Sequence, residues 1–194
     1  HMEFCQIQLN YLDWTLQNAK GTYDLLTQRG IPVWVMEPVR GGKLAQLPEA
    51  LGAELKARRP QESEAAWAFR WLQALPNVKM ILSGMSNLEQ MKDNVATFER
   101  GAALTPEETA LLAHIADSMH SGVPCTGCRY CQPCPRNVHI PDIFHAWDES
   151  LMFDRPETLK RSMARRQENK EDPSQCVACG KCEKACPQHL PIVK

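Results

Sequence analysis

The chain has 194 residues, of which 43% are hydrophobic and 23% are charged, and its formal net charge is −1. This length suits one or two domains with a hydrophobic core, and the near-neutral charge gives no electrostatic case for binding nucleic acid or anionic membranes. No apolar run reaches the roughly 18 residues of a membrane span, and the N-terminus lacks the layout of a signal peptide. Residues 1–2, His-Met, look like a cloning remnant, so we begin the fold at residue 3.

Residues 3–120 are predicted to alternate strands and helices. Apolar runs at 4–12, 31–38 and 77–84 predict strands, and the last two are expected to be buried on both faces because they are continuous. Helical periodicity and stop signals predict five helices, near 14–30, 46–58, 62–75, 86–98 and 104–119. Such alternation favours parallel strands with helices outside them, and therefore an α/β domain with about three strands.

Two of these predicted helices carry capping signals at their N-termini. Ser86 and Glu89 have the spacing of a capping box. Thr105 is followed by Pro106 at the first helical position, and Glu108 closes a second box.

From residue 121 onward, strand-like runs vanish and cysteine, proline and charge dominate. The segment 142–170 is predicted to be helical, with an apolar face formed by Ile143, Phe144, Trp147 and Leu151. Its second part, 154–170, carries charges of both signs and is predicted to be a solvated surface helix. A boundary near Ser121-Gly122 therefore separates the predicted domains 3–120 and 121–194.

Eight of the nine cysteines lie in two short motifs, 125-CTGCRYCQPCP-135 and 176-CVACGKCEKACP-187. A disulfide framework usually joins distant segments, and no export signal is present, so we expect a reducing, cytoplasmic setting. In that setting, clustered thiols usually bind metal. The isolated Cys5 is expected to be a small buried hydrophobic residue.

The second motif has the spacing C-x2-C-x2-C-x3-C-P, which is typical of ferredoxin [4Fe–4S] clusters. Short spacings turn three successive sulfurs toward one centre, and in two-cluster ferredoxins the fourth cysteine ligates the other cluster. We therefore predict a crossed arrangement, in which each motif supplies three ligands to one cluster and the fourth ligand to its neighbour. The first set is Cys176, Cys179, Cys182 and Cys134; the second is Cys125, Cys128, Cys131 and Cys186.

Alternatives remain open at this point. The last spacing of the first motif is one residue shorter than the ferredoxin pattern, which leaves ligation by Cys134 undecided. The other hypotheses for the motifs are a zinc site, a single iron–sulfur cluster and redox-active thiols. Gly127 and Gly180 are expected to let backbone N–H groups approach the sulfurs, and Pro135 and Pro187 end the ligand runs. Five histidines show no ligand-like pairing and are expected to be unliganded: His114, His120, His139, His145 and His189.

The run 78-VKMILSGMSNLEQMKDNV-95 resembles the last strand and following helix of the aldo-keto reductase family, a TIM-barrel group that uses NADPH. A phosphate can bind at a helix N-terminus, and the usual phosphate site of such a barrel follows its last two strands. The resemblance implies that the adenine-nucleotide end of the cofactor contacts Gly84, Ser86, Gln90, Asp93 and Asn94. Asp93 stands where the family usually has glutamate.

Two upstream segments extend this resemblance. The run 31-IPVWVMEPVRGGKL-44 is similar to the preceding strand and loop, with Pro38 and Gly42 in register and Met36 where the family places an aromatic ring against the nicotinamide. The segment 8-QLNY-11 is similar to a Q-x-E-Y segment and implies that Gln8 holds the nicotinamide carboxamide. The whole of 3–194 resembles the C-terminal part of the iron–sulfur branch of the family, through VPCTGCRYCQPCP and CVACGKCEKACPQ.

The resemblance implies an incomplete (β/α) TIM-barrel half followed by a mainly helical, ferredoxin-like domain with two [4Fe–4S] clusters. The family's catalytic tyrosine and its partners belong to the first half of the barrel, and Tyr11 and Tyr23 do not stand in that position. We therefore expect no catalytic residue in this chain and no carbonyl reduction by it alone.

For an intact protein, the resemblance implies NADP(H), a small carbonyl substrate and a redox partner protein. An uncovered part-barrel is expected to self-associate, to rearrange or to belong to a longer protein. The alternative is a non-catalytic ferredoxin-like carrier or docking module, or a zinc-stabilised structural domain.

Overall fold

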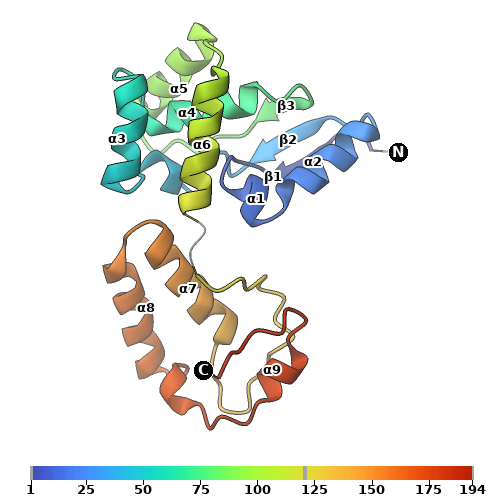
Figure 1. Ribbon diagram of the computed structural model, residues 1–194, viewed down its shortest axis with the longest axis vertical. Coiled ribbons are helices and arrows are strands. Elements are labelled where there is room, and N and C mark those ends of the chain that lie inside the picture. The colour runs from blue at the N-terminus through green and yellow to red at the C-terminus, as the bar shows by residue number, and fades with distance from the viewer. Residues whose placement is uncertain (1, 120–121, 194) are drawn as a thin grey trace. The chain divides into compact units, whose positions relative to one another are not determined.

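A computed structural model describes residues 2–119 and 122–193, and the chain divides into two compact units, His1–Met119 and His120–Lys194 (Figure 1). We call them the α/β unit and the cysteine unit. The predicted boundary beside Ser121, like His1 and His120, lies outside the described residues. Within the described part of the chain, no helix has the length and apolar character that a membrane span requires.

The α/β unit contains a three-stranded parallel sheet in the order β1-β2-β3. Its strands are β1 (Cys5–Gln8), β2 (Val33–Met36) and β3 (Val78–Ile81), so the prediction of about three parallel strands is confirmed. Each strand is shorter than its apolar run. β2 lies between Pro32 and Pro38, which have no N–H to donate to a neighbouring strand.

The sheet is buried on one face only, so the prediction that β2 and β3 are buried on both faces is wrong. Val33 and Val35 are fully buried, whereas Met36 is 40% exposed and Met80 is 44% exposed. The register pairs Trp34 with Met80, and side chains alternate along a strand, so both methionines lie on the same open face. An apolar run shows that a strand can be covered on two sides, but not that two covering layers are present. Cys5, predicted to be buried, is half-exposed in β1.

Helices follow each strand, as predicted, with one interruption. The predicted helix 14–30 is two helices, α1 (Asp13–Leu16) and α2 (Ala19–Gln28), because Asn18 takes a left-handed φ of 52°. The later helices are α3 (Glu49–Arg58), α4 (Glu64–Gln73), α5 (Leu88–Arg100) and α6 (Pro106–Ser118), and a short 3-10 turn, η1 (Lys43–Ala45), follows β2. The core is centred on α4, whose Trp67, Phe69 and Leu72 are buried.

The two capping predictions have different outcomes. The capping box of α6 is confirmed: the Thr105 hydroxyl accepts from the Glu108 N–H at 3.2 Å, and the Glu108 carboxylate accepts from the Thr105 N–H at 2.8 Å. At α5 the N-cap is Asn87, not Ser86, and its side-chain oxygen accepts from the Gln90 N–H at 2.9 Å. Asn and Ser are about equally good N-cap residues, so residue type does not choose between them. Asn87 is the cap because its backbone is extended directly before the helix begins.

A buried network of ion pairs connects α6 to the start of α4. No sequence motif predicts this network. Arg70 is 1% exposed and donates to the Glu62 carboxylate at 2.7 and 2.9 Å and to the Ala102 carbonyl at 2.7 Å. Arg59 donates to both carboxylate oxygens of Glu108 at 2.6 Å. Paired, bidentate contacts of this kind hold buried charges in a fixed geometry.

This network is expected to make the α/β unit less stable in acid. Burial raises the pKa of Glu62, but Arg70 and Arg59 outweigh it, and Arg59 likewise holds the pKa of Glu108 below the ordinary value of 4.5. A carboxylate whose pKa is lowered by folding stabilises the folded state fully at a pH above its ordinary pKa. This stabilisation is lost as the pH falls through the pKa of the folded state. Urea unfolding between pH 7 and pH 3 should show this loss. A Glu62→Gln/Glu108→Gln variant should be less stable at pH 7 and depend less on pH, and an unchanged dependence would contradict the expectation.

The described part of the cysteine unit contains helices and loops but no strand. Its elements are α7 (Ile140–Met152), α8 (Pro156–Glu168), the 3-10 turn η2 (Pro173–Gln175) and α9 (Lys181–Ala185), and α8 packs along α7 (Figure 1). No residue of α8 is buried, which agrees with the predicted solvated helix. The predicted apolar face of α7 is partly wrong, because Trp147 is 46% and Leu151 is 45% exposed. The other two residues of that face, Ile143 and Phe144, are half-buried and line the larger cysteine pocket.

Candidate metal centre and cofactor site

The eight motif cysteines lie on two loops of the cysteine unit and on α9. Gly127 (φ 66°) and Gly180 (φ 69°) both take left-handed conformations inside the motifs, and nothing lies within 4 Å of the position a Cβ would occupy on either. Left-handed residues turn the chain sharply, so successive cysteines can face one space. At Cys176, the sulfur accepts from the backbone N–H of Ala178 at 3.4 Å, which is the kind of amide contact expected near cluster sulfurs.

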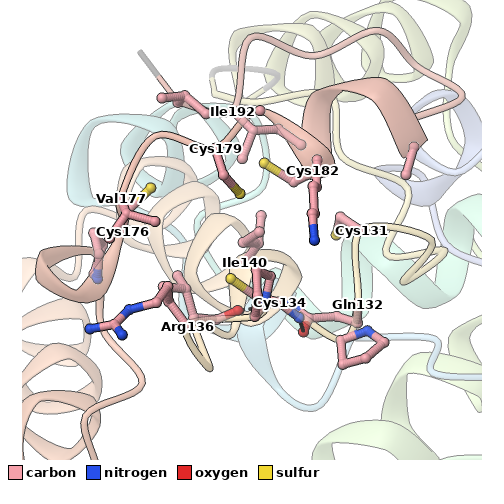
Figure 2. Close-up of a pocket in the computed structure, with 18 of the residues that line it drawn as sticks. Cys131, Gln132, Cys134, Arg136, Ile140, Cys176, Val177, Cys179, Cys182 and Ile192 are labelled. Atoms are coloured by element: carbon pink, nitrogen blue, oxygen red, sulfur yellow. Dashed lines mark hydrogen bonds between the residues drawn. The ribbon is translucent and has the colours of Figure 1, made fainter.

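The larger pocket brings together cysteines from both motifs. It is a cavity of about 220 Å³ whose lining includes Cys134 from the first motif and Cys176, Cys179 and Cys182 from the second. Figure 2 shows the sulfurs of Cys134, Cys179 and Cys182 around one common space, with Cys176 at its edge beside Val177. Cys131 also borders this pocket.

A smaller pocket, of about 20 Å³, combines the motifs the other way round. Its lining includes Cys125, Cys128 and Cys131 from the first motif and Cys186 from the second. The rest of the lining is largely apolar, with Ile140, Phe144, Leu190 and Ile192. Each fourth cysteine therefore lies with the three thiols of the opposite motif.

The larger pocket fits a multi-atom group better than a single ion, whereas the smaller one, of about 20 Å³, has room for little more than one water molecule. Four sulfurs around one tetrahedral zinc would lie about 3.8 Å apart, because each Zn–S bond is about 2.3 Å. Over residues 2–119 and 122–193, no three His, Cys, Asp or Glu side chains are close enough together to hold one metal ion. Sulfurs spread around a cavity of about 220 Å³ suit a cuboidal cluster instead.

The eight thiols differ in exposure and in proton affinity. Cys128, Cys176 and Cys179 are exposed, whereas Cys186 is buried. Burial raises the pKa of the Cys131 and Cys182 thiols. Metal ligation requires thiolates, so loading either pocket releases protons.

The described histidines lie apart from both pockets. His139 Nδ1 is 3.7 Å from an Asp142 oxygen, and His145 Nε2 is 3.4 Å from a Glu149 oxygen. Neither these two nor His114 nor His189 is among the residues that line the pockets.

The residues predicted to contact a nicotinamide cofactor lie at one edge of the sheet. Gln8 and Met36 end β1 and β2 and are register partners, and the Leu82 N–H beyond β3 donates to the Val35 carbonyl at 2.8 Å. The carboxyl ends of parallel strands form the edge at which α/β proteins bind ligands. Pro38 is buried just beyond β2, and Gly84 lies in the exposed loop beyond β3.

The predicted phosphate-end residues include one pair that hydrogen-bonds to each other. The Gln90 side-chain oxygen accepts from the Ser86 N–H at 2.7 Å. Asp93 accepts from the Ser63 hydroxyl at 2.5 Å, and the Asn94 amide donates to the Ser83 hydroxyl at 3.2 Å. The structure thus brings Ser86 and Gln90 together at the start of α5, whereas Asp93 and Asn94 bond to serines outside that helix.

Asp13 lies at the same sheet edge and belongs to no motif. Its carboxylate is fully buried, accepts from the side-chain amides of Gln8 at 2.8 Å and Asn10 at 2.7 Å, and lies 3.3 Å from Arg40 Nε. Because the Gln8 amide nitrogen is held by Asp13, its carbonyl oxygen is oriented away from that contact. The only hint in the sequence is an acidic residue between a strand and a helix.

The hydroxyls of the two tyrosines of the α/β unit are not accessible to a substrate. Tyr11 is 3% exposed, its hydroxyl is buried, and burial raises its pKa. The Tyr23 hydroxyl accepts from the Asn77 N–H at 3.1 Å. Neither hydroxyl is placed to give a proton to a bound molecule.

Comparisons with known proteins match both units. The model of the Aldo/keto reductase family matches residues 1–117, and the model of a 4Fe-4S dicluster domain matches residues 124–191. No curated protein matches the chain.

Proposed function

The chain belongs to the aldo/keto reductase family, and we propose that it is the NADP(H)-linked, two-cluster part of an iron–sulfur oxidoreductase. In this proposal, residues 3–120 are the C-terminal part of a (β/α) barrel, and residues 121–194 are a ferredoxin-like domain that transfers electrons. The observation that carries it is the mixing of the two cysteine motifs in each pocket.

The cysteines hold two [4Fe–4S] clusters in the crossed arrangement. Cys134, Cys176, Cys179 and Cys182 hold the first, and Cys125, Cys128, Cys131 and Cys186 hold the second. A bound cluster supplies reversible transfer of one electron. The chain's own residues hold it by thiolates, donate backbone N–H groups such as that of Ala178, and exclude water from the smaller pocket with Phe144 and Leu190.

The α/β unit binds one face of the nicotinamide cofactor. Gln8 binds the carboxamide with an amide oriented by Asp13, and Met36 packs beside the ring from the open face of the sheet. The start of α5, with Ser86 and Gln90, binds the phosphate end. The substrate of the intact protein is a small carbonyl compound. This chain alone does not reduce it, because Tyr11 and Tyr23 are both closed.

The open face of the sheet also favours association. Parallel sheets are normally covered on both faces, and Met36 and Met80 are exposed here. We therefore expect this face to be covered by further barrel strands or by a second copy of the chain.

The second candidate function is a non-catalytic electron carrier attached to a relic barrel, which the closed tyrosines favour. Titration of the loaded chain with NADPH separates the two candidates. Saturable binding that Gln8→Ala weakens supports the oxidoreductase, and absence of any nicotinamide binding leaves the carrier.

Iron and acid-labile sulfide analysis after anaerobic purification tests the clusters. About eight of each per chain is expected for two [4Fe–4S] clusters. Two zinc ions per chain without sulfide would overturn the assignment, since zinc sites contain no inorganic sulfide.

A further inference from the structure

In the part of the chain that the structure describes, two cations and no acidic side chain line the larger cysteine pocket. Arg136 and Lys181 line this pocket, and no Asp or Glu does. Among the described residues, neither cation has an ion-pair partner: Arg136 Nε donates to the Gln175 carbonyl at 3.4 Å, and Lys181 is exposed. Lys184 is exposed three residues later on α9, which places it on the same side of the helix as Lys181.

The smaller pocket differs in this respect. The one cation among its described lining residues, Arg129, donates to an Asp142 carboxylate oxygen at 2.7 Å. Of its four cysteines only Cys128 is exposed and Cys186 is buried, whereas Cys176 and Cys179 of the larger pocket are both exposed. A group in the larger pocket therefore lies nearer solvent and beside uncompensated positive charge.

Large apolar side chains stand among these cations. Val177, between the two exposed cysteines, is 60% exposed, and Tyr130 on the opposite loop is 69% exposed. Both line the larger pocket, and Figure 2 shows Val177 and Arg136 on the same side of it. Exposed aromatic groups next to Arg are typical of protein interfaces. We call this surface the Val177 face; it consists of Tyr130, Arg136, Val177, Lys181 and Lys184.

Resting on the cluster assignment above, we propose that the Val177 face docks an acidic protein that carries single electrons. The cluster on Cys134, Cys176, Cys179 and Cys182 exchanges the electron there. In the inward direction, the carrier loses one electron and the cluster gains it, and no bond forms or breaks. Cations without an acidic side-chain partner attract an acidic protein and raise its association rate, and the exposure of Val177, Cys176 and Cys179 lets that protein approach the cluster ligands.

Charge reversal on the loaded full chain tests the docking. The test variant is Arg136→Glu/Lys181→Glu, and the matched control is Arg161→Glu/Arg165→Glu, which changes the net charge equally on exposed positions of α8 outside both pockets. The probe is a reduced flavodoxin, an acidic one-electron carrier, and stopped-flow absorbance follows reduction of the cluster. The rate for the unsubstituted chain should fall as salt is added, and the test variant should be roughly tenfold slower or more at low salt, while the control changes far less.

The possible results distinguish a failure of the docking from a failure of the cluster assignment. Equal slowing of test variant and control, or a rate for the unsubstituted chain that does not fall as salt is added, would overturn the docking proposal. Iron and sulfide are measured first: their absence from the unsubstituted chain refutes the clusters, whereas loaded clusters with unchanged rates refute only the docking. If the test variant holds less iron, Lys184→Glu is compared with Arg161→Glu instead, because Lys184 lies outside the pocket lining.

Discussion

Replacing Cys186 with alanine is expected to lower the iron content of the loaded chain from about eight to about four atoms. Cys186 is the buried fourth cysteine of the smaller pocket, so no other thiol replaces it there. A cluster held by Cys125, Cys128 and Cys131 alone leaves one iron without a protein ligand, and the site opens to solvent where the sulfur stood. Iron and acid-labile sulfide per chain, measured after anaerobic reconstitution, report the loss.

Cys5 provides the matched control for this replacement. It is a half-exposed cysteine in β1 of the α/β unit and borders neither pocket. Cys5→Ala should retain all the iron. Full iron content in Cys186→Ala would show that this thiol is not a required ligand.

Replacing Arg70 with methionine is expected to lower the free energy of unfolding of the α/β unit by about 3 kcal/mol. The change leaves the Glu62 carboxylate without its main partner and the Ala102 carbonyl without a donor, in a region where Arg70 is 1% exposed. Breaking one side of a buried pair is expensive because the remaining charge stays desolvated. Urea unfolding followed by tryptophan fluorescence measures the change, in a Trp147→Phe background so that only the α/β unit reports.

An exposed ion pair in the same unit gives the comparison. Lys20 and Asp24 pair at 2.5 Å on α2, with side chains 55% and 43% exposed. Lys20→Met should change the free energy of unfolding by no more than about 0.5 kcal/mol, since solvent screens such pairs. If Arg70→Met has no larger effect than Lys20→Met, the buried network does not stabilise the unit.

The order of strands and helices in the α/β unit was predictable because local signals agree with the fold. Proline-bounded apolar runs mark β2, and Thr105 and Glu108 mark the start of α6 without help from other segments. The break at Asn18 and the choice of Asn87 as a cap depend on backbone conformation that neighbouring residues leave undecided. The open face of the sheet depends on which layers are present, and an apolar run carries no record of that.

The grouping of the cysteine sulfurs was predictable from the sequence, but the residues that surround them were not. Short spacings gather three thiols of each motif locally, so Cys176, Cys179 and Cys182 share a pocket as expected. The uncompensated charge of Arg136 depends on tertiary contacts that bring distant segments together. The same holds for Asp13, whose fully buried carboxylate is recognisable only once Gln8, Asn10 and Arg40 surround it.

Paired cysteine replacements test the crossed arrangement most directly, with iron per chain as the measurement. In the crossed arrangement, Cys125→Ala/Cys186→Ala removes two ligands of one cluster, so about four irons remain. If each motif held its own cluster, the same pair would remove one ligand from each cluster, and almost no iron would remain. Cys125→Ala/Cys176→Ala damages both clusters under either arrangement and sets the baseline. Retention of about four irons in the first pair, well above that baseline, is the expected result. Loss of iron to the baseline in that pair would contradict the crossed clusters.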